Sequence, residues 1–390
     1  FDPGQAVFLA GTVVNGTVKL ELKDAMKMRG VRLTSFGRAC VRWSEVENVG
    51  HRGGRQRVAK VDYSSDEEYF QFRFQLWPPE NSLDDSLPAG LHTFPFRIPL
   101  PLDLPPSFEG AYGYIRYWAK ATIDKPWKFD HHTKRAFTVI PSLDLNQQAD
   151  VAEPIQYRGE LRTGCCCLPS GRFSGTIATN RKGFVPGSEI GLSSQIDNHT
   201  SSTCWAEIRL KMHITYGAGG KFKQEKKVVS TVCREQIPRG KNYIWKDRIR
   251  IPPLPPSHLM GCKIMNSKYI LQFRVGSDAK CSWDEIEFED EIIIGTLPLV
   301  SKPRLQALAN PNMQINVVVP LTVIPAEKDM DKNVEGKPSY EECMLFGRVN
   351  IKDKDDTEHT LGELIFTPLY AFYTARTPIQ RASSFIEQAT

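Results

Sequence analysis

Several features that would place a chain in a membrane or in an oxidising compartment are missing from this sequence. No apolar run approaches ~18 residues, the length that a membrane-spanning helix needs. A secretory signal is also absent. The nine cysteines are an odd number without Cys-x-x-Cys spacing, which argues against a disulfide framework. We therefore expect a reduced, cytoplasmic chain. It begins at Phe1, without methionine and inside an expected strand, so we expect the natural N-terminus to lie upstream.

Catalytic motifs are missing as well. The sequence has no Gly-x-Ser-x-Gly, no P-loop and no His-Glu-x-x-His, which favours a protein that is not an enzyme and has no cofactor. His131 and His132 are adjacent, so on a strand they would face opposite sides, and we expect a turn-exposed pair rather than a metal site. The acidic run at 284–291 lacks the spacing of a calcium loop and is interpreted as a solvated strand edge.

Strong charge bias and helical periodicity are also lacking. The net charge of +5 is too small to favour nucleic acid, although a weak attraction to acidic membrane surfaces remains open. Short alternating runs dominate, such as VRLTSFGRACVRW at 31–43, and 55 glycines and prolines in total punctuate them. Alternation places every second side chain on one face, as in a half-buried antiparallel strand. The fold class predicted is all-β, built from antiparallel sandwiches.

One phrase of the sequence occurs twice. Pro-Gly followed by an alternating run appears at Pro3 and again at Pro186. Further along each copy, a glycine precedes Pro-Pro-Ser, with 17 residues from Gly90 to Ser107 and 17 from Gly240 to Ser257. A tyrosine-bearing strand then follows in both copies. This order predicts tandem copies of one domain, each a sandwich of roughly 140 residues.

The repeat sets the expected domain boundaries. They are a first domain at 1–142, a polar linker at 143–156, and a second domain at 157–326 with its core at 157–300 and an additional strand at 315–324. Residues 327–390 are expected to form a flexible tail, because their charged stretches are poor in apolar residues. The first copy is longer mainly through Ser44–Tyr69, which is interpreted as a long solvated hairpin loop. Its HRGGRQR stretch leaves contact with RNA or phosphoinositide as the less favoured alternative.

These residues, in this order, resemble the α-arrestins, the arrestin-domain-containing proteins. The resemblance is carried by PGQAVFLAGTVV, GVRLTSFGRACVRW, the run from Leu87 to Trp127, and NRKGFVPGSEI, with weaker matches in the tail. It implies two immunoglobulin-like arrestin sandwiches. It also implies adaptor work, in which the sandwiches meet membrane receptors or transporters as cargo. Pro-Pro-x-Tyr motifs in the tail dock into WW domains of HECT-type ubiquitin ligases, and the ligase marks the cargo for endocytosis and sorting at the plasma membrane and endosomes.

The tail departs from that family pattern. Its two candidate WW-binding motifs are Lys337-Pro338-Ser339-Tyr340 and Thr367-Pro368-Leu369-Tyr370, and both lack the first proline. Each missing ring removes groove contact and a preset dihedral, so affinity should fall by about 1 kcal/mol per site. Two weak sites on one tail would recover part of this through avidity. We expect both tyrosines to lie outside the cores, so that truncating them costs under ~0.5 kcal/mol of stability.

The remaining candidates are cysteines. The triplet Cys165, Cys166 and Cys167 offers palmitoylation sites that suit a peripheral membrane adaptor, whereas zinc would need a fourth ligand that the spacing does not supply. The favoured interpretation of this triplet is a strand entry or buried small apolar side chains, and palmitoylation is the alternative. Cys233 precedes a charged turn, and a redox-responsive protein acting through this thiol is one rival hypothesis. The other rival is a non-catalytic trafficking scaffold of the retromer-associated kind that recruits no ligase.

Overall fold

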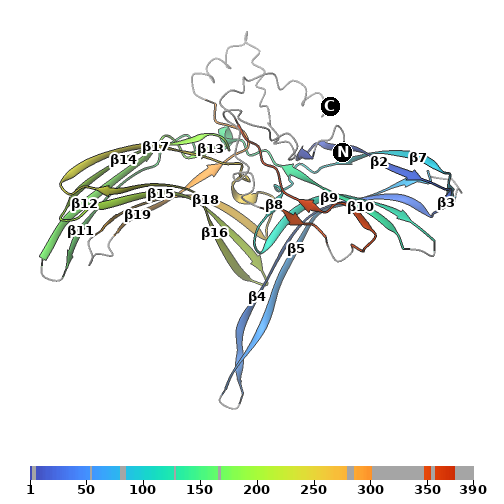
Figure 1. Cartoon of the computed structure of the whole chain (residues 1–390), viewed down its shortest axis with the longest axis horizontal. Coiled ribbons are helices and arrows are strands. Elements are labelled where there is room, and N and C mark those ends of the chain that lie inside the picture. Colours follow the sequence, from blue (N-terminus) through green and yellow to red (C-terminus); the bar gives the residue numbers. More distant parts are fainter. Residues whose placement is uncertain are drawn as a thin grey trace, which may run out of the picture.

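The computed structural model describes the chain at residues 1, 6–52, 55–79, 85–126, 129–165, 168–278, 285–300, 347–352 and 356–373. Most of this is β-strand, in two sandwich-like halves joined side by side (Figure 1). The only helical elements in the described ranges are two short 3₁₀ turns, η1 (Leu145–Gln147) and η2 (Ser257–Leu259). The predicted all-β fold with two tandem sandwiches is confirmed.

The first half, which we call the N half, places one large sheet against a small one. The large sheet runs in the order β1-β10-β9-β4-β5, with β8 also paired to β9, and the facing sheet is β2-β7. A short pair, β3-β6, closes one end. The bounds are β1 (Val7–Leu9), β2 (Val13–Leu22), β3 (Met26–Lys27), β4 (Gly30–Arg52), β5 (Arg55–Trp77), β6 (Ser86–Leu87), β7 (Gly90–Pro99), β8 (Phe108–Glu109), β9 (Gly113–Asp124) and β10 (His131–Ile140).

The second half, the C half, repeats this arrangement. Its large sheet runs β13-β19-β18-β15-β16, and its facing sheet runs β11-β12-β14-β17. In both large sheets the first strand, β1 or β13, pairs in parallel with the last strand, β10 or β19, and the other pairings among β1–β19 are antiparallel. The bounds are β11 (Gln156–Cys165), β12 (Leu168–Thr179), β13 (Gly183–Phe184), β14 (Glu189–Thr200), β15 (Cys204–Ala218), β16 (Lys221–Ile237), β17 (Lys241–Arg250), β18 (Met265–Ser277) and β19 (Glu285–Ile294).

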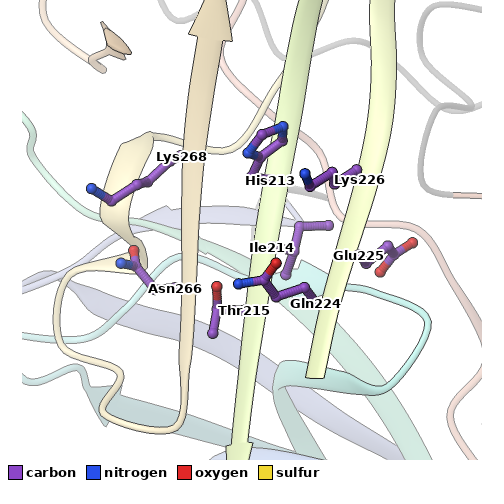
Figure 2. A pocket seen from close by; sticks show the side chains of 8 residues that line it. All are labelled: His213, Ile214, Thr215, Gln224, Glu225, Lys226, Asn266 and Lys268. Atoms are coloured by element: carbon purple, nitrogen blue, oxygen red, sulfur yellow. The ribbon is translucent and has the colours of Figure 1, made fainter. Parts of the chain in front are cut away.

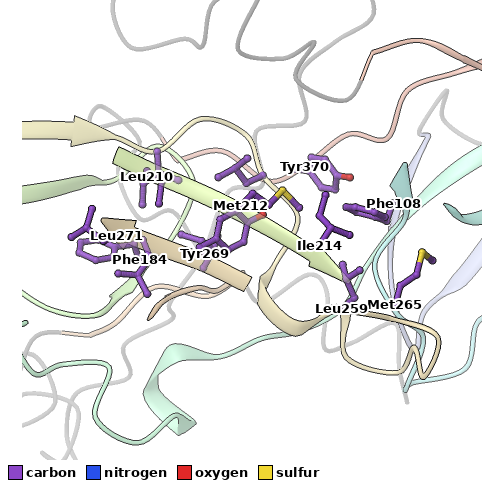
Figure 3. Close-up of a cluster of buried hydrophobic side chains, with 14 of the residues drawn as sticks. Phe108, Phe184, Leu210, Met212, Ile214, Leu259, Met265, Tyr269, Leu271 and Tyr370 are labelled. Carbon is purple, nitrogen blue, oxygen red and sulfur yellow. The ribbon is translucent and has the colours of Figure 1, made fainter. Parts of the chain in front are cut away.

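Alternation along the strands builds the core. In β15 every second residue is buried from Cys204 to Ala218, while the residues between them are half-buried on the outer face. One hydrophobic cluster runs through both halves and includes Phe108 from the N half and Met212 from the C half (Figure 3). The two sandwiches therefore share a continuous apolar interior at their junction.

The repeated Pro-Pro-Ser has the same structural role in both halves. The Ser107 hydroxyl accepts a hydrogen bond from the backbone N–H of Val139 at 2.9 Å, and Ser257 accepts one from Ile294 at 2.9 Å. Each bond fastens the loop to the last strand of its own large sheet. Buried serine hydroxyls and backbone amides need such partners, which explains why the motif recurs.

The repeated tyrosine fastens the same loop from the other side. Tyr117 on β9 donates its hydroxyl to the carbonyl of Pro105 at 2.7 Å, and Tyr269 on β18 donates to that of Pro255 at 2.8 Å. Both rings are fully buried. Their hydroxyls would otherwise lack a partner, so the proline carbonyl and the tyrosine satisfy one another.

A glycine after each Pro-Pro-Ser lets the opposite half approach. A Cβ on Gly110 would lie 2.0 Å from the Tyr216 hydroxyl of the C half. A Cβ on Gly261, where φ is +94°, would lie 2.5 Å from the Asp103 carbonyl of the N half. The junction between the halves is therefore close at backbone level on both sides.

The expected polar linker is packed rather than free. Leu143, Leu145 and Val151 are buried, and Leu143 N–H donates to Thr296 Oγ1 at 2.7 Å. The predicted strand at 315–324 lies outside the described residues. The hairpin predicted at 44–69 is present, but the expectation of a loop is wrong, because β4 and β5 continue as paired strands to Arg52 and from Arg55, with a register shift between Asn48 and His51. Figure 1 shows this two-stranded ribbon projecting far beyond both sheets.

The expectation of a flexible tail is also wrong for the part that the structure describes. Residues 347–352 and 356–373, here called the docked segment, pack on the two halves and contain β20 (Val349–Asn350), β21 (Thr360–Glu363) and β22 (Ile365–Phe366). The physical reason is that residues 364–373, LIFTPLYAFY, are rich in apolar side chains and bury enough surface to offset the entropy of ordering.

Candidate interaction surfaces

The docked segment adds a strand to the N half. β21 pairs in parallel with β10, with Thr360 opposite His132 and Glu363 opposite Arg135. β1 pairs in parallel with the other end of β10, at 138–140. The edge of β10 is thus covered by two segments that are distant in sequence, which removes unpaired backbone groups from the sheet edge.

A buried ion cluster fixes the start of the docked segment. Asp356 has a fully buried side chain, and its Oδ2 lies 2.8 Å from Lys134 Nζ, while its Oδ1 lies 3.1 Å from Lys120 Nζ. The two lysines stand directly opposite one another on β10 and β9. Opposed like charges destabilise a sheet, so Asp356 offsets their repulsion. Lys134 Nζ also donates to the Ile351 carbonyl at 2.9 Å and lies 4.8 Å from the Trp118 ring.

Apolar side chains hold the rest of the docked segment. Ile351 and Phe366 pack with Trp118 in one buried cluster. Tyr370 is 5% exposed and donates its hydroxyl to the Ser107 carbonyl at 3.1 Å. Burial raises the pKa of Tyr370 well above its ordinary value. Figure 3 shows the Tyr370 ring within the shared core. At the end of the docked segment, the Tyr373 hydroxyl donates to the Thr296 carbonyl at 2.5 Å.

This packing determines whether the two candidate WW motifs are accessible to a WW domain. Pro338 and Tyr340 lie outside the described residues. Pro368 and Tyr370 are buried, so the expectation that Tyr370 lies outside the cores is wrong. A WW groove must enclose both the proline and the tyrosine ring, and in this fold the sandwiches already enclose them. The signal that the sequence reasoning missed is the apolar run around the motif.

The cysteine candidates lie apart from this surface. Cys165 ends β11, and Cys166 and Cys167 lie outside the described residues. Cys233 is exposed on β16, and its Sγ lies 3.6 Å from Glu207 Oε1. A neighbouring carboxylate disfavours a thiolate, so this contact gives no support to a reactive thiol. The structure brings none of the predicted cysteines to the docked segment in the described ranges.

The acidic run of β19 faces a basic neighbour strand. Arg274 on β18 binds Glu285 at 2.5 Å, and Lys268 binds Glu291 at 3.0 Å. Lys211 on β15 reaches Glu289 at 3.2 Å. These pairs form a ladder across the outer face of the C half, which gives Glu285, Glu289 and Glu291 basic partners. The expected turn-exposed histidine pair is wrong, because His131 and His132 belong to β10.

A small depression lies beside this ladder. It has a volume of about 170 Å³ and is lined mostly by polar residues of β15, β16 and β18, including His213, Lys226 and Lys268 (Figure 2). Lys226, His213 and Lys268 stand in one row across the three strands. Burial, followed by the nearby Lys226, lowers the pKa of His213, so the row carries a neutral ring between two ammonium groups.

The projecting ribbon is braced against the C half at its root. Trp43 stacks on Tyr63 with ring centroids 5.3 Å apart, and Tyr63 donates to Glu47 at 2.5 Å. Lys221 on β16 binds Glu47, and Lys223 binds Glu45 at 2.6 Å. The bond to Glu47 raises the pKa of Lys221, and the same bond lowers the pKa of Glu47, so both groups stay charged at neutral pH.

Comparison with known protein families agrees with the division into two halves. Two family descriptions match in series: "Arrestin (or S-antigen), N-terminal domain" over residues 1–146, and "Arrestin (or S-antigen), C-terminal domain" over residues 169–299. No helix in the described residues is long and apolar enough to cross a bilayer.

Named relatives point the same way. Arrestin domain-containing protein 17 of Caenorhabditis elegans is 29% identical over 99% of this chain and 87% of its own length. Arrestin domain-containing protein 4 of Homo sapiens is 30% identical over 76% of this chain and 70% of its own. Thioredoxin-interacting protein of Homo sapiens is 28% identical over 70% of this chain and 67% of its own.

Proposed function

The chain belongs to the α-arrestin family, and from this premise we propose that it is a cytoplasmic adaptor that links membrane receptors or transporters to ubiquitin ligases. At the coarser level it is an arrestin-type trafficking or regulatory scaffold. The observation that carries the proposal is the series of two complete arrestin sandwiches, which leaves outer sheet faces and loops available for protein cargo. We propose that the adaptor works at the plasma membrane and endosomes, without catalysis.

In this proposal, only one of the two tail motifs recruits the ligase. The motif ending at Tyr370 contributes to the folded core, so its tyrosine and Pro368 are not free to enter a WW groove. The motif ending at Tyr340 is therefore proposed as the docking site for a HECT-type ligase. A single motif without the first proline has no avidity partner on this chain, so the interaction should be weak.

The test compares Tyr340→Ala with a matched tyrosine elsewhere. Tyr243 is 36% exposed on β17, so Tyr243→Ala makes the same truncation on a folded surface. Full chains at matched concentration are titrated with a tandem WW fragment of a HECT-type ligase. We expect Tyr340→Ala to abolish binding, because a tyrosine anchor dominates so small an interface, and Tyr243→Ala to bind like the wild type.

Equal WW binding by the wild type and Tyr340→Ala would remove the ligase arm of the proposal. The scaffold without a ligase would then be favoured. Proximity labelling of membrane proteins in cells tests the cargo arm separately, since it does not depend on Tyr340. The redox alternative through Cys233 makes a different demand, namely thiol alkylation at neutral pH that is faster than for an ordinary exposed cysteine.

A further inference from the structure

β16 lies at the edge of the large sheet of the C half. It spans 17 residues and, among the described residues, pairs with β15 alone. In an antiparallel pair, the backbone N–H and C=O groups of every second residue of an edge strand point away from its partner. Within the part of the chain that the structure describes, no backbone hydrogen bond joins residues 222–228 to a segment other than β15. This edge can therefore accept a further strand.

The part of the edge between Phe222 and Val228 is regular. Its residues pair one for one with β15, from Gly217 opposite Phe222 to Lys211 opposite Val228. The register shifts immediately beyond Val228, so a bulge ends the regular pairing. Seven residues of extended chain reach about 24 Å, which is the length of an ordinary strand. We call residues 222–228 the edge stretch.

Four exposed side chains of the edge stretch share the outer face of the sheet. Phe222 is 74% exposed and Val228 is 53% exposed, and the exposed Gln224 and Lys226 lie between them on the same face. All four stand opposite the half-buried outer residues of β15. An added strand would place its own alternate side chains beside these four and would cover both apolar groups.

Lys226 supplies a positive charge between the two apolar side chains. It forms no ion pair with any described residue, whereas the adjacent Lys227 binds Glu225 at 3.2 Å. Lys226 also stands at the rim of the depression that is lined by His213 and Lys268 (Figure 2). The local charge is therefore positive, and a carboxylate placed beside Lys226 would be attracted to it.

The charge of this edge favours a foreign strand over a second copy of the chain. Residues 221–227 contain four lysines and one glutamate. Lys221 and Lys223 are paired with glutamates of the ribbon, which leaves Lys226 for a partner. Two copies would bring one lysine-rich edge against another, and like charges on paired strands are destabilising. An acidic strand from a different protein complements the edge.

We propose that the edge stretch, residues 222–228, binds an extended segment of a partner protein that adds to the sheet as a strand. The segment carries an acidic side chain opposite Lys226 and apolar side chains opposite Phe222 and Val228. Main-chain hydrogen bonds would supply affinity, and the alternate side chains would supply specificity. This site is independent of ligase recruitment, because the edge stretch and the motif ending at Tyr340 are separate parts of the chain.

The first experiment is a charge swap between the peptide and the protein. Full chains are titrated at low salt with a fluorescent peptide of core sequence Val-Thr-Glu-Thr-Thr-Thr-Val, and with the same peptide carrying lysine in place of glutamate. Anisotropy measures binding. We expect the wild type to prefer the acidic peptide about five-fold, and Lys226→Glu to prefer the basic peptide by a similar factor. Lys246→Glu makes the same change at an exposed position on β17 and should keep the wild-type preference.

A second pair of variants tests the apolar contacts. Phe222→Thr with Val228→Thr keeps residues that favour strands but removes most of the apolar surface. We expect it to bind both peptides about ten-fold more weakly. The control is Tyr243→Thr with Ile244→Thr, which shortens two exposed side chains on β17 and should bind like the wild type. Circular dichroism of each variant at the assay temperature confirms folding.

N-methylation of the peptide backbone tests strand addition itself. On an added strand, only every second amide faces β16. A peptide that is N-methylated on one alternate set of amides should therefore lose binding, and a peptide methylated on the other set should keep it. A segment that lay flat on the outer face would lose or keep binding with both peptides alike.

Four results would overturn the proposal. The first is the absence of binding by either peptide up to about 1 mM, and the second is an unchanged peptide preference in Lys226→Glu. The third is an equal effect of the two methylation patterns. The fourth is a dimer of the full chain that the acidic peptide dissociates, which would assign the edge to a second copy. The WW titrations with Tyr340→Ala do not involve this edge, so the two proposals fail separately.

Discussion

The N half and the C half have the same strand order but different edges. In the N half, β10 carries β21 of the docked segment, and the facing sheet has only β2 and β7. In the C half, the facing sheet gains β11 and β12, and the outer face of β19 carries an ion-pair ladder. The hairpins at the other edge of the two large sheets also differ in length. In the N half, β4 and β5 span 23 residues each, whereas in the C half β15 spans 15.

The two halves share their buried loop contacts, and they differ in elements at the surface, where a partner protein could bind. The serine and tyrosine bonds of the Pro-Pro-Ser loop recur almost atom for atom, because both sandwiches need that loop fastened to the last strand. Only the N half has a long ribbon and a strand added by the docked segment, although the ribbon is braced by Lys221 and Lys223 of the C half and Tyr373 bonds to Thr296 there. We infer that the repeat supplies a stable frame and that these two additions supply further specific contacts.

Tyr370→Ala should have the largest effect on stability, because it removes a core side chain that the docked segment adds. The ring fills a site in the shared core and has no counterpart on the edge of the C half, so its loss should lower the free energy of unfolding by about 3–5 kcal/mol. Urea denaturation measures the change. Tyr340→Ala is the control and should leave stability within about 0.5 kcal/mol. A loss below 1 kcal/mol for Tyr370→Ala would mean that the ring is not part of the core.

Lys134→Met should be next in size, because it removes one lysine from the buried Asp356 carboxylate. Breaking a buried pair costs about 3 kcal/mol, although Lys120 retains part of the attraction. Limited proteolysis should then cut the docked segment faster than in the wild type. Arg135→Met changes the next residue, whose exposed pair with Glu363 should contribute under 1 kcal/mol. Similar proteolysis of both variants would contradict the role given to the buried pair.

Tyr117→Phe and Tyr269→Phe test whether the equivalent loop contacts of the two halves contribute equally to stability. Each removes one hydroxyl and leaves one buried proline carbonyl without its donor, at a cost of about 1–3 kcal/mol. Because the two bonds are equivalent, the two losses should agree within about 0.5 kcal/mol. Thermal or urea unfolding of the single variants checks this. A large effect in one half and none in the other would show that the loop is fastened differently in the two sandwiches.

His213→Gln should have the smallest effect and only below neutral pH. Burial and Lys226 lower the pKa of His213, partly opposed by Glu289, so the unfolded chain binds more protons than the folded chain below about pH 6.5. Stability should therefore fall as pH drops through this value toward the lower folded pKa. The variant should lose part of this slope in urea titrations between about pH 7 and 5. His199→Gln, at an exposed position on β14, is the control, and identical slopes in both variants would refute the argument.

The sandwiches were predictable because their evidence is local and repeated. Alternation at 31–43 and the equal spacing from Gly90 and Gly240 required no knowledge of distant contacts. The ribbon was missed because glycines and charges interrupt the alternation between Trp43 and Tyr63, although cross-strand pairing continues. The docked segment was missed for another reason, since Asp356 meets Lys134 across 222 residues, and no local pattern announces such a pair.

The most direct test of the central claim is amide hydrogen exchange of β21 in the full chain. Residues 360–363 form a strand of the N half, paired with β10, and not an exposed tail. Their amides should be protected to a degree comparable with β10, and Lys134→Met should lower this protection while Arg135→Met leaves it nearly unchanged. Exchange of β21 at the rate of an unstructured peptide would contradict the account.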